Sequence, residues 1–480
     1  MTEQGVLKQA RPYVNGEWLV DGREKLQVKS PFTGEVIGEQ YLATMEDVEK
    51  ALQSAFESKK EIGAIPAYKR ANILKRAAEL LHEQRESFAK LISLELGKPL
   101  KNTLDEVARS VETLQLSGEE AKRLTGESIP GDASERGTNA IAMTFRVPVG
   151  VIAAITPFNS PLNLVCHKIG PAFAAGNAVV LKPAPQTSLI ATALLKLLLE
   201  AGFPEIAVNM VLGGVEVGQE IVKDDRVNVI SFTGGTVASR NICKLAGMKK
   251  VLLELGGNAA TIVHEDADLA RAALMCARTG FSNSGQSCIS VQRIYVHQAV
   301  VLKFKELLKD EVAKLIVGDP LSPETDVGTL VDEKAAGRII DWIDQSVKAG
   351  AELVFGGKQN GANVQPTILF NPPKTTNVVC QEVFGPIVSI LPYEDIDEAI
   401  AEANDSEFGL QAGIFTNRLD LAYKAAHALE VGGVVINGTS NYRLDHWPYG
   451  GVKNSGIGRE GPRFAIEDMT ETKMIVLQLS

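Results

Sequence analysis

The stretch from residue 149 to residue 255 constrains the fold most, because apolar strand-like runs alternate there with helical runs. We predict strands at 149–156, 178–182, 207–212, 227–232 and 251–255, and helices at 161–175, 188–201, 216–223 and 236–246. Strands joined through helices need crossover connections, so the pattern predicts an α/β fold with a parallel sheet. Such sheets bind ligands beyond the carboxyl ends of their strands. We predict a cofactor crevice at that edge, where four residues lie at or just past strand ends: Asn159, Lys182, Gly234 and Glu254.

The same alternation begins again after Asn258 and predicts a second α/β domain. Its strands are expected at 261–263, 293–296, 351–355, 388–392, 412–415 and 433–437, and its helices at 266–279, 299–315, 333–349, 395–403 and 418–430. Nearer the N-terminus we expect short strands over 11–41, with a hairpin turn at Val14–Glu17, and helices over 44–96 and 104–124. We place the first domain at 1–122 and 147–254 and the second at 255–467. Two segments, 123–146 and 468–480, contain strand-like runs without an obvious partner in either domain.

Charge and cysteine content exclude several classes of function. A formal net charge of −10 disfavours nucleic acid or an anionic membrane as the main partner. The five cysteines form no CxxC pair, so neither a disulfide scaffold nor a zinc site is expected. No histidine stands at metal-ligand spacing, and His167 is expected to be a hydrogen-bonded core residue, so we predict no metal. Met1–Gln9 lacks an apolar signal segment and the apolar runs are too broken to span a bilayer, which predicts a cytoplasmic protein.

Cys288 is a candidate nucleophile. The run 281–289, F-S-N-S-G-Q-S-C-I, places it in a small polar loop between two apolar segments. Its neighbours Gly285, Gln286 and Ser287 leave the sulfur approachable and offer hydrogen-bond donors, which favours the reactive thiolate. The alternative is a buried thiol that only packs, as we expect of Cys276.

Glu254 is a candidate general base. It lies in the middle of V-L-L-E-L-G-G-N, a strand-like apolar run over 251–258. A carboxylate in an apolar strand is costly unless it is paired or protonated, so desolvation should raise its pKa. The alternative is a salt-bridged structural glutamate.

Two glycine-containing stretches could bind a dinucleotide. The one GxGxxG pattern, Gly456–Gly461, is followed by too short a segment for a βαβ unit with a ribose-binding acid, so we predict a turn before a final helix. The run 232–236, F-T-G-G-T, follows a strand and opens a helix, whose N-terminal N–H groups can bind a phosphate. A plain strand-to-helix turn is the alternative there.

Together with Asn159 in I-T-P-F-N-S-P, the stretches around Glu254 and Cys288 resemble the aldehyde dehydrogenase superfamily. The segments E-V-F-G-P at 382–386 and P-Y-G-G-V-K-N-S-G-I-G-R-E-G at 448–461 add to the resemblance, which extends from about residue 11 to the end. It implies an aldehyde dehydrogenase-like fold with a Rossmann-type parallel-sheet cofactor domain, an α/β catalytic domain and a small β oligomerisation domain. The last would comprise 123–146 and 468–480 and form a homodimer or homotetramer, with the terminal strand extending a neighbour's sheet.

The resemblance implies NAD(P)-dependent, non-acylating oxidation of an aldehyde to a carboxylate. Cys288 would attack the carbonyl, and the Asn159 amide and the Cys288 backbone N–H would hold the oxyanion. With the cofactor as hydride acceptor a thioester would remain, and Glu254 would activate the water that hydrolyses it.

The resemblance also implies a cofactor site, with the pyrophosphate at the helix opened by 232–236. This chain departs from the family there, having Gly235 in place of the usual Ser and Ser239 in place of the usual Gly. The expected cofactor-binding residues are Thr156, Pro157, Phe158, Lys182, Pro185, Gly218, Phe232, Thr233, Gly234, Gly235, Leu255, Gly256, Glu382 and Phe384.

Four of these have implied roles at the two ends of the cofactor. Lys182 would bind the adenosine ribose, Glu382 would hold the nicotinamide ribose, and Phe384 would pack beside the nicotinamide ring. Pro185 stands where NAD-preferring members commonly have a glutamate that would repel a 2′-phosphate. We therefore expect NADP to be used at least as well as NAD.

The expected substrate residues are Arg109, Asn159, Ser287 and Arg443. In relatives that act on small anionic aldehydes, arginines at the positions of Arg109 and Arg443 help hold the anion. Those relatives usually add an arginine where this chain has Ser287, and a salt-bridged arginine is the alternative at both positions. We predict a short polar aldehyde of two to four carbons with a hydroxyl or anionic group, of the lactaldehyde, glyceraldehyde phosphate, succinic semialdehyde or sulfolactaldehyde type.

Other functions stay open. A thiol acyl hydrolase or acyltransferase using Cys288 would need a partner histidine and would leave the crevice unexplained. A non-catalytic protein would not need Cys288, Glu254 and Asn159 together. A CoA-acylating relative would not need Glu254, and a general aldehyde dehydrogenase would take apolar or aromatic aldehydes.

Overall fold

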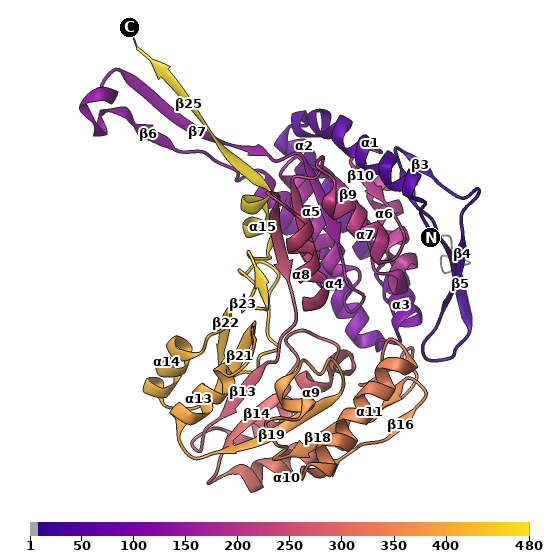
Figure 1. The fold of residues 1–480 in the computed structure, drawn as a ribbon, viewed down its shortest axis with the longest axis vertical. Coiled ribbons are helices and arrows are strands. Elements are labelled where there is room, and N and C mark those ends of the chain that lie inside the picture. Colours follow the sequence, from indigo (N-terminus) through magenta and orange to yellow (C-terminus); the bar gives the residue numbers. More distant parts are fainter. Residues whose placement is uncertain (1–7, 480) are drawn as a thin grey trace.

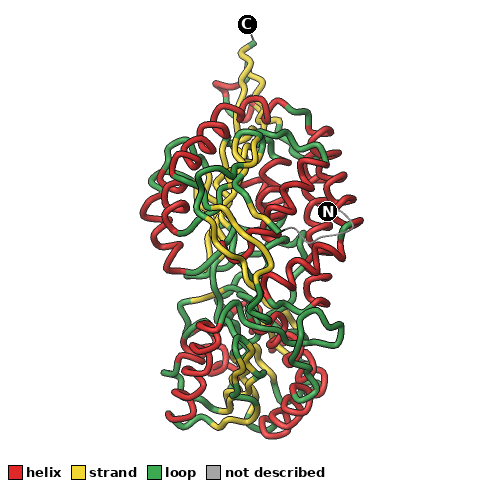
Figure 2. Tube along the Cα trace, turned by 90° about the vertical axis from the view of Figure 1, so that its right-hand side faces the viewer, coloured by secondary structure: helices red, strands yellow, loops and turns green. Residues whose placement is uncertain are grey.

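The computed structural model describes residues 8–479 and is built around two large sheets, from which an arm projects (Figure 1). Residues 1–7, part of the stretch used to predict the absence of a signal peptide, lie outside the described residues. Helices cover both faces of each large sheet, as Figure 2 shows from the side. Within residues 8–479, no helix combines the length and apolar character needed to cross a membrane.

The first large sheet has eight strands in the order β24-β12-β11-β8-β9-β10-β2-β3. Its strands are β2 (Tyr13–Val14), β3 (Glu17–Trp18), β8 (Val151–Ile155), β9 (Ala178–Lys182), β10 (Val208–Met210), β11 (Val229–Thr233), β12 (Lys250–Glu254) and β24 (Gly456–Ile457). The central strands from β12 to β10 pair in parallel, which confirms the predicted parallel sheet. β8 and β9 are buried along their whole length, as expected for strands covered on both faces.

The helices of this half follow the predicted order. They are α1 (Met45–Ala64), α2 (Ala67–Glu83), α3 (Arg85–Leu96), α4 (Leu100–Ala121), α5 (Asn163–Ala174), α6 (Ser188–Glu200), α7 (Val215–Lys223) and α8 (Thr236–Leu245). The predicted hairpin turn is present, since Asn15 (φ 49°) and Gly16 (φ 84°) adopt the left-handed conformations that a tight two-residue turn requires.

The second large sheet has seven strands in the order β15-β18-β19-β14-β13-β21-β22. Its strands are β13 (Ala260–Val263), β14 (Arg293–His297), β15 (Glu352–Phe355), β18 (Thr367–Phe370), β19 (Ile387–Tyr393), β21 (Gln411–Phe415) and β22 (Gly433–Ile436). Its helices are α9 (Leu269–Phe281), α10 (Val301–Val312), α11 (Glu333–Lys348), α12 (Asn377–Cys380), α13 (Ile396–Asn404) and α14 (Leu419–Ala428). All pairs are parallel except β15 with β18, so the second α/β unit is also present as predicted.

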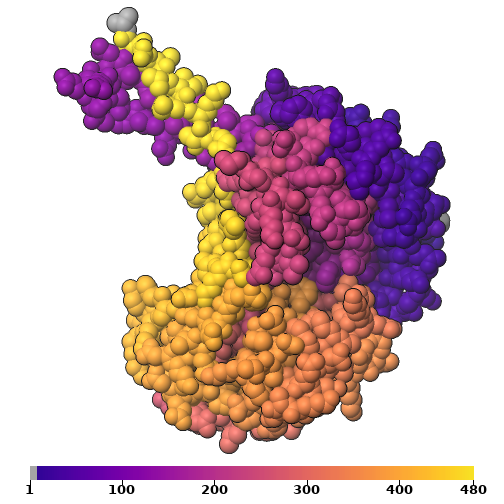
Figure 3. All heavy atoms as spheres, in the orientation of Figure 1, coloured from indigo at the N-terminus to yellow at the C-terminus, as the bar shows by residue number. Residues whose placement is uncertain are grey.

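The arm consists of β6 (Ser128–Pro130), β7 (Ala140–Pro148) and β25 (Thr470–Gln478). β25 pairs antiparallel with the whole of β7, from Thr470 opposite Pro148 to Gln478 opposite Ala140. The segments 123–146 and 468–480, for which the sequence indicated no partner in either domain, therefore contain strands that pair with each other. The arm stands clear of the body (Figure 3), and the exposed side chains on it include Ile129, Ile141, Phe145, Ile475 and Leu477.

Short elements complete the fold. They are β1 (Gln9–Ala10), β4 (Lys25–Lys29), β5 (Val36–Tyr41), β16 (Gln359–Asn360), β17 (Asn363–Val364), β20 (Phe408–Gly409), β23 (Val452–Lys453) and α15 (Pro462–Asp468). The GxGxxG segment forms a turn before α15, as predicted, with Gly461 at φ 112°. β24 within that segment pairs with β12, so residues 456–457 belong to the first sheet although the predicted boundary places 255–467 in the second domain.

Candidate active site

A cavity of about 380 Å³ lies at the carboxyl ends of β8, β11 and β12, and the second half of the chain forms its other walls. Its lining includes the three predicted catalytic side chains, Cys288, Glu254 and Asn159. The remaining lining residues are Pro157, Phe158, Leu164, Thr233, Gly234, Gly235, Leu255, Gly256, Arg338, Glu382, Phe384, Arg443, Tyr449 and Glu460.

The loop before Cys288 has an unusual backbone. Asn283 (φ 50°), Ser284 (φ 55°) and Gly285 (φ 70°) are consecutive residues in the left-handed region, where a non-glycine residue is strained. A Cβ on Gly285 would lie 2.1 Å from the carbonyl oxygen of Gly385, so only glycine fits there. The Gln286 side chain ties the loop down, donating to the Asn283 carbonyl (3.3 Å) and accepting from Val331 N (3.0 Å).

Cys288 is partly buried at the cavity wall, and desolvation of its thiol raises its pKa. The prediction that Gly285, Gln286 and Ser287 would supply hydrogen-bond donors differs from the arrangement found, because the Gln286 side chain is used to brace the loop. The hydrogen bond of the sulfur is instead with the Tyr449 hydroxyl, 3.0 Å away.

Asn159 is held against the same loop. One N–H of its side-chain amide donates to the Gln286 carbonyl (3.0 Å), and the amide has a second N–H to offer. The backbone carbonyl of Asn159 accepts from Lys98 Nζ (3.3 Å) and from the side-chain amide of Asn283 (3.1 Å). Within residues 8–479 the backbone N–H of Cys288 has no hydrogen-bond acceptor. The cavity that contains the sulfur thus has two N–H groups without an acceptor among the described residues, which are the kind of donor that an oxyanion requires.

Glu254 ends β12 and is 7% exposed. Burial, and next the nearby Glu460 carboxylate, raise its pKa well above the ordinary value. Its Oε2 atom is buried and has no hydrogen-bond partner among the described residues. The predicted desolvated carboxyl is therefore present, with one oxygen available to a water molecule or a ligand.

The N-terminus of α8 opens toward this cavity. Gly235 is the residue before α8, no side chain caps the helix, and a Cβ at Gly235 would meet no atom within 4 Å. The first-turn N–H groups are therefore free to face an anion. Ser239, the second departure from the family pattern, donates its hydroxyl to Thr236 O (2.8 Å).

The predicted cofactor residues divide between two cavities. The large cavity contains Pro157, Phe158, Thr233, Gly234, Gly235, Leu255, Gly256, Glu382 and Phe384. A second cavity, of about 220 Å³ beside α8, contains Lys182, Pro185, Gly218 and Phe232. Thr156 lines neither, and its buried hydroxyl has no partner among the described residues.

Three cofactor candidates have distinctive surroundings. Burial lowers the pKa of Lys182 to about 8. Glu382 accepts a hydrogen bond from Gly257 N (3.1 Å), and burial raises its pKa to about 7. The Phe384 ring meets Phe158 edge to face, with centroids 5.9 Å apart.

Of the predicted substrate residues, Asn159 and Arg443 line the large cavity, whereas Arg109 and Ser287 do not. Arg109 forms a two-point ion pair with Asp445 (2.9 and 2.7 Å). Arg443 donates to Glu460 (2.7 Å), and its buried Nε lies 3.9 Å from Asp445 Oδ1 without a hydrogen bond among the described residues.

His167 is buried, as predicted for a core histidine, and it connects the two arginines. Its Nε2 atom lies 2.8 Å from Asp445 Oδ1 and 3.1 Å from Arg443 Nη2. Burial lowers its pKa. Within residues 8–479, no group of three or more potential ligands is arranged to hold a metal ion.

Sequence reasoning missed Tyr449, Glu460 and Arg338 as cavity residues. Tyr449 and Glu460 both lie in the segment 448–461, where the match to a family pattern identified the segment but not the role of each side chain. Nothing in the sequence around Arg338, on α11, distinguishes it from a surface arginine.

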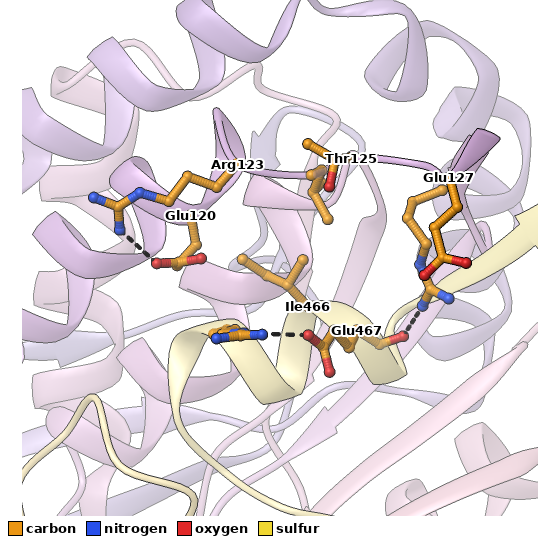
Figure 4. Close-up of a pocket in the computed structure, with 9 residues that line it drawn as sticks. Glu120, Arg123, Thr125, Glu127, Ile466 and Glu467 are labelled. Atoms are coloured by element: carbon orange, nitrogen blue, oxygen red, sulfur yellow. Dashed lines mark hydrogen bonds and ion pairs between the residues drawn. The ribbon is translucent and has the colours of Figure 1, made fainter. Parts of the chain in front are cut away.

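A larger cavity, of about 610 Å³, lies at the base of the arm (Figure 4). Its charged side chains are mainly paired with one another or with the backbone, for example Arg123 with Glu120 (2.6 Å) and Arg463 with Glu467 (3.3 Å). Its lining contains neither a thiol nor an imidazole, so it offers no chemistry comparable with that around Cys288.

Comparison with known proteins agrees with this geometry. The model of the aldehyde dehydrogenase family matches residues 18–475. A 3-sulfolactaldehyde dehydrogenase of Priestia megaterium is 48% identical over 480 residues, covering 100% of both chains. A lactaldehyde dehydrogenase of Methanococcus maripaludis is 41% identical and covers 97% of this chain and 99% of its own. The crystal structure of an NADP-dependent glyceraldehyde-3-phosphate dehydrogenase from Bacillus halodurans, complexed with NADP, is 37% identical with a TM-score of 0.96, covering 98% of this chain and 100% of its own.

Proposed function

The chain belongs to the aldehyde dehydrogenase family, and on this premise we propose that it oxidises a short aldehyde with an anionic group to the carboxylate, using NADP at least as well as NAD. The observation that supports this most is that Cys288, Asn159, Glu254 and Arg443 line one cavity. A thiol, an amide donor, a desolvated carboxyl and a cation are the groups that this reaction needs.

In the proposed reaction the Cys288 thiolate attacks the aldehyde carbon, and the carbonyl oxygen becomes an oxyanion. The second N–H of the Asn159 amide and the free backbone N–H of Cys288 hold that oxyanion. Because the Cys288 N–H belongs to a braced loop and the Asn159 amide is hydrogen-bonded to that loop, both donors need little reorganisation during the reaction. Loss of one such donor typically costs about 2.7–4 kcal/mol of barrier.

In the second half, Glu254 accepts a proton from water, which attacks the thioester carbon and releases the carboxylate and the Cys288 thiolate. A carboxyl with a raised pKa suits this task, because it holds the proton more strongly than a solvated carboxylate would. The unpartnered Oε2 atom is available to orient the water molecule.

The residues present fit a nicotinamide dinucleotide. We propose that the uncapped N-terminus of α8 binds the pyrophosphate, that Lys182 binds the adenosine ribose, and that Glu382 holds the nicotinamide ribose. When bound, the nicotinamide supplies the hydride acceptor. Pro185 in the second cavity introduces no acidic group that would repel a 2′-phosphate. Consistent with this, the Bacillus halodurans neighbour is a complex with NADP.

For the substrate we propose a three-carbon hydroxyaldehyde of the sulfolactaldehyde or lactaldehyde type, named after the similar enzymes, and we favour the anionic one. Arg443 supports this choice, since it lines the cavity and its buried Nε makes no hydrogen bond among the described residues, the nearest acidic atom being Asp445 Oδ1 at 3.9 Å. Arg109 and Ser287 stay predictions with weaker geometric support, because neither lines the cavity.

We further propose that the protein is cytoplasmic and forms a homo-oligomer through the arm. We also keep the domain bounds proposed from the sequence, with 1–122 and 147–254 in the first domain, 255–467 in the second, and 123–146 and 468–480 in the oligomerisation segments. Free cysteines at all five positions suit a reducing compartment. The apolar side chains exposed on the arm suit contact with a second copy. A monomer in sedimentation at micromolar concentration would contradict the oligomer.

The proposed function is tested by following NADPH or NADH at 340 nm with purified protein. The panel comprises sulfolactaldehyde, lactaldehyde, glyceraldehyde 3-phosphate, succinic semialdehyde, propanal and benzaldehyde, each with both cofactors. We expect the highest kcat/KM for a short anionic aldehyde with NADP. Best activity with benzaldehyde would contradict the substrate proposal, and acyl hydrolysis without reduced cofactor would contradict the reaction.

A further inference from the structure

Tyr449 lies on the cavity wall directly against the Cys288 thiol. Its hydroxyl oxygen is 3.0 Å from Cys288 Sγ, and no other side chain among the described residues lies within hydrogen-bond distance of that sulfur. Tyr449 is 6% exposed and packs in a small apolar cluster with Ile289 and Leu410. The phenol is therefore a buried hydroxyl in hydrogen-bond contact with the candidate nucleophile, and either of the two atoms can be the donor.

The tyrosine is fixed from both sides. Tyr449 N donates to Glu460 O (3.0 Å), and Glu460 N donates to Tyr449 O (2.6 Å), which forms an isolated antiparallel bridge. The Arg443 guanidinium covers the ring face, 3.9 Å from the centroid, and donates to the Glu460 carboxylate at 2.7 Å. The position of the phenol is thus set by backbone and ion-pair contacts.

The surroundings of the sulfur disfavour the thiolate form of Cys288, so a hydrogen-bond donor beside the sulfur would stabilise that form. Burial is the main cause that raises the pKa of Cys288, and the nearby carboxyls of Glu382 and Glu254 raise it further. Two groups oppose this, the hydrogen bond from Tyr449 and the positive charge of Arg443. Asn159 makes no hydrogen bond to the sulfur: one of its amide N–H groups donates to Gln286 O, and the hydrogen bond of the sulfur is with Tyr449.

We propose that Tyr449 is a further catalytic residue, whose phenol O–H donates a hydrogen bond to the Cys288 thiolate and holds the sulfur ready to attack the aldehyde. The inference rests on the proposed role of Cys288 as nucleophile. Tyr449 keeps its own proton, because burial also raises its pKa, and the thiol proton leaves to water. When the sulfur electron pair forms the C–S bond, the negative charge moves to the carbonyl oxygen and the hydrogen bond from Tyr449 weakens.

The test is the pH dependence of Cys288 alkylation in wild type and in Tyr449→Phe. Intact protein without aldehyde or cofactor is treated with iodoacetamide from about pH 5.5 to pH 10, and the modified Cys288 peptide is quantified by mass spectrometry. A hydrogen bond to a charged group is worth enough to move the apparent pKa of Cys288 upward by about 1–2 pH units in the variant. Alkylation at pH 7 should then be about 10- to 100-fold slower.

Two controls separate this role from general damage to the fold. Exposed Cys380 reports on the same samples, and its alkylation should not change. Tyr393→Phe is the matched variant, because it also removes a buried hydroxyl, one bonded to His264 Nδ1 at 2.9 Å, and it should leave the Cys288 profile unchanged. Thermal unfolding of all three proteins verifies that they are folded.

An unchanged Cys288 profile in Tyr449→Phe, or one shifted to lower pH, would overturn the proposal. Steady-state kinetics give a second readout: kcat/KM should fall at pH 7 and recover as the pH approaches the raised pKa. A purely structural role would lower kcat/KM equally at every pH. Because alkylation needs no aldehyde, the role of Tyr449 can be judged even if the proposed substrate or reaction proves wrong.

Discussion

Replacing Arg443 with alanine should affect substrate recognition and stability for two separable reasons. Arg443 is 9% exposed on its side chain and is paired with Glu460, whose side chain is 5% exposed. If the guanidinium binds the anionic group of the substrate, its loss removes a hydrogen bond between charged groups worth about 1.5–3 kcal/mol, or a fall of about 10- to 150-fold in kcat/KM. The same change leaves the Glu460 carboxylate buried without its partner, which costs about 3–5 kcal/mol of stability.

The assay compares sulfolactaldehyde with propanal, which has no anionic group. Effects of Arg443→Ala on the nucleophile or the fold should lower kcat/KM for both aldehydes, whereas loss of the anion contact should lower it for sulfolactaldehyde alone. The double variant Arg443→Ala/Glu460→Gln removes the stranded charge, so its melting temperature should recover while sulfolactaldehyde binding does not. Arg109→Ala is the matched control. It should change the ratio of the kcat/KM for sulfolactaldehyde to that for propanal less than Arg443→Ala does, because both hydrogen bonds of the Arg109 guanidinium go to Asp445. Equal losses for the two aldehydes would refute the reasoning.

Three further outcomes follow from the site. Cys288→Ala should abolish dehydrogenase and esterase activity while the protein stays folded, and turnover above about a thousandth of wild type would remove Cys288 as the nucleophile. Pro185→Glu should shift preference toward NAD, measured as the ratio of kcat/KM values for NAD and NADP, and an unchanged ratio would contradict the adenosine site. Because the pKa of Glu254 is raised in the folded state, its favourable effect on stability is complete below its ordinary value near 4.5 and is lost as the pH rises toward the raised value. Glu254→Gln should therefore gain in melting temperature relative to wild type between pH 5 and pH 8, and a difference independent of pH would argue against the raised pKa.

The sequence was sufficient for the central sheets, because the alternation of apolar strands and helices leaves few topologies open. It was insufficient for β18, which is four residues long and flanked by Pro366 and by the pair at 372–373, so that it reads as a loop. The pairing of β7 with β25 could not be predicted either, because the two strands are distant in the chain and neither has a sequence pattern that indicates which strand it pairs with.

Within the site, residue types could be predicted from motifs, but their contacts could not. Cys288 and Tyr449 are 161 positions apart, and the loop composition suggested neighbouring donors in place of this distant phenol. Arg109 and Asp445 are 336 positions apart, so the ion pair formed by Arg109 could be named only as an alternative. Both contacts depend on how the segment after β22 folds back over the first sheet, a feature that local pattern does not encode.

The central claim is that oxidation proceeds through a thioester on Cys288. It is tested most directly by mixing Glu254→Gln with sulfolactaldehyde and NADP, quenching in acid within the first turnover, and locating the acyl group by peptide mass spectrometry. If Glu254 activates the hydrolytic water, a burst of about one equivalent of NADPH should coincide with an acyl group on the Cys288 peptide. A burst with the acyl group on Cys243 or Cys380, or with no acyl-enzyme at all, would contradict the account.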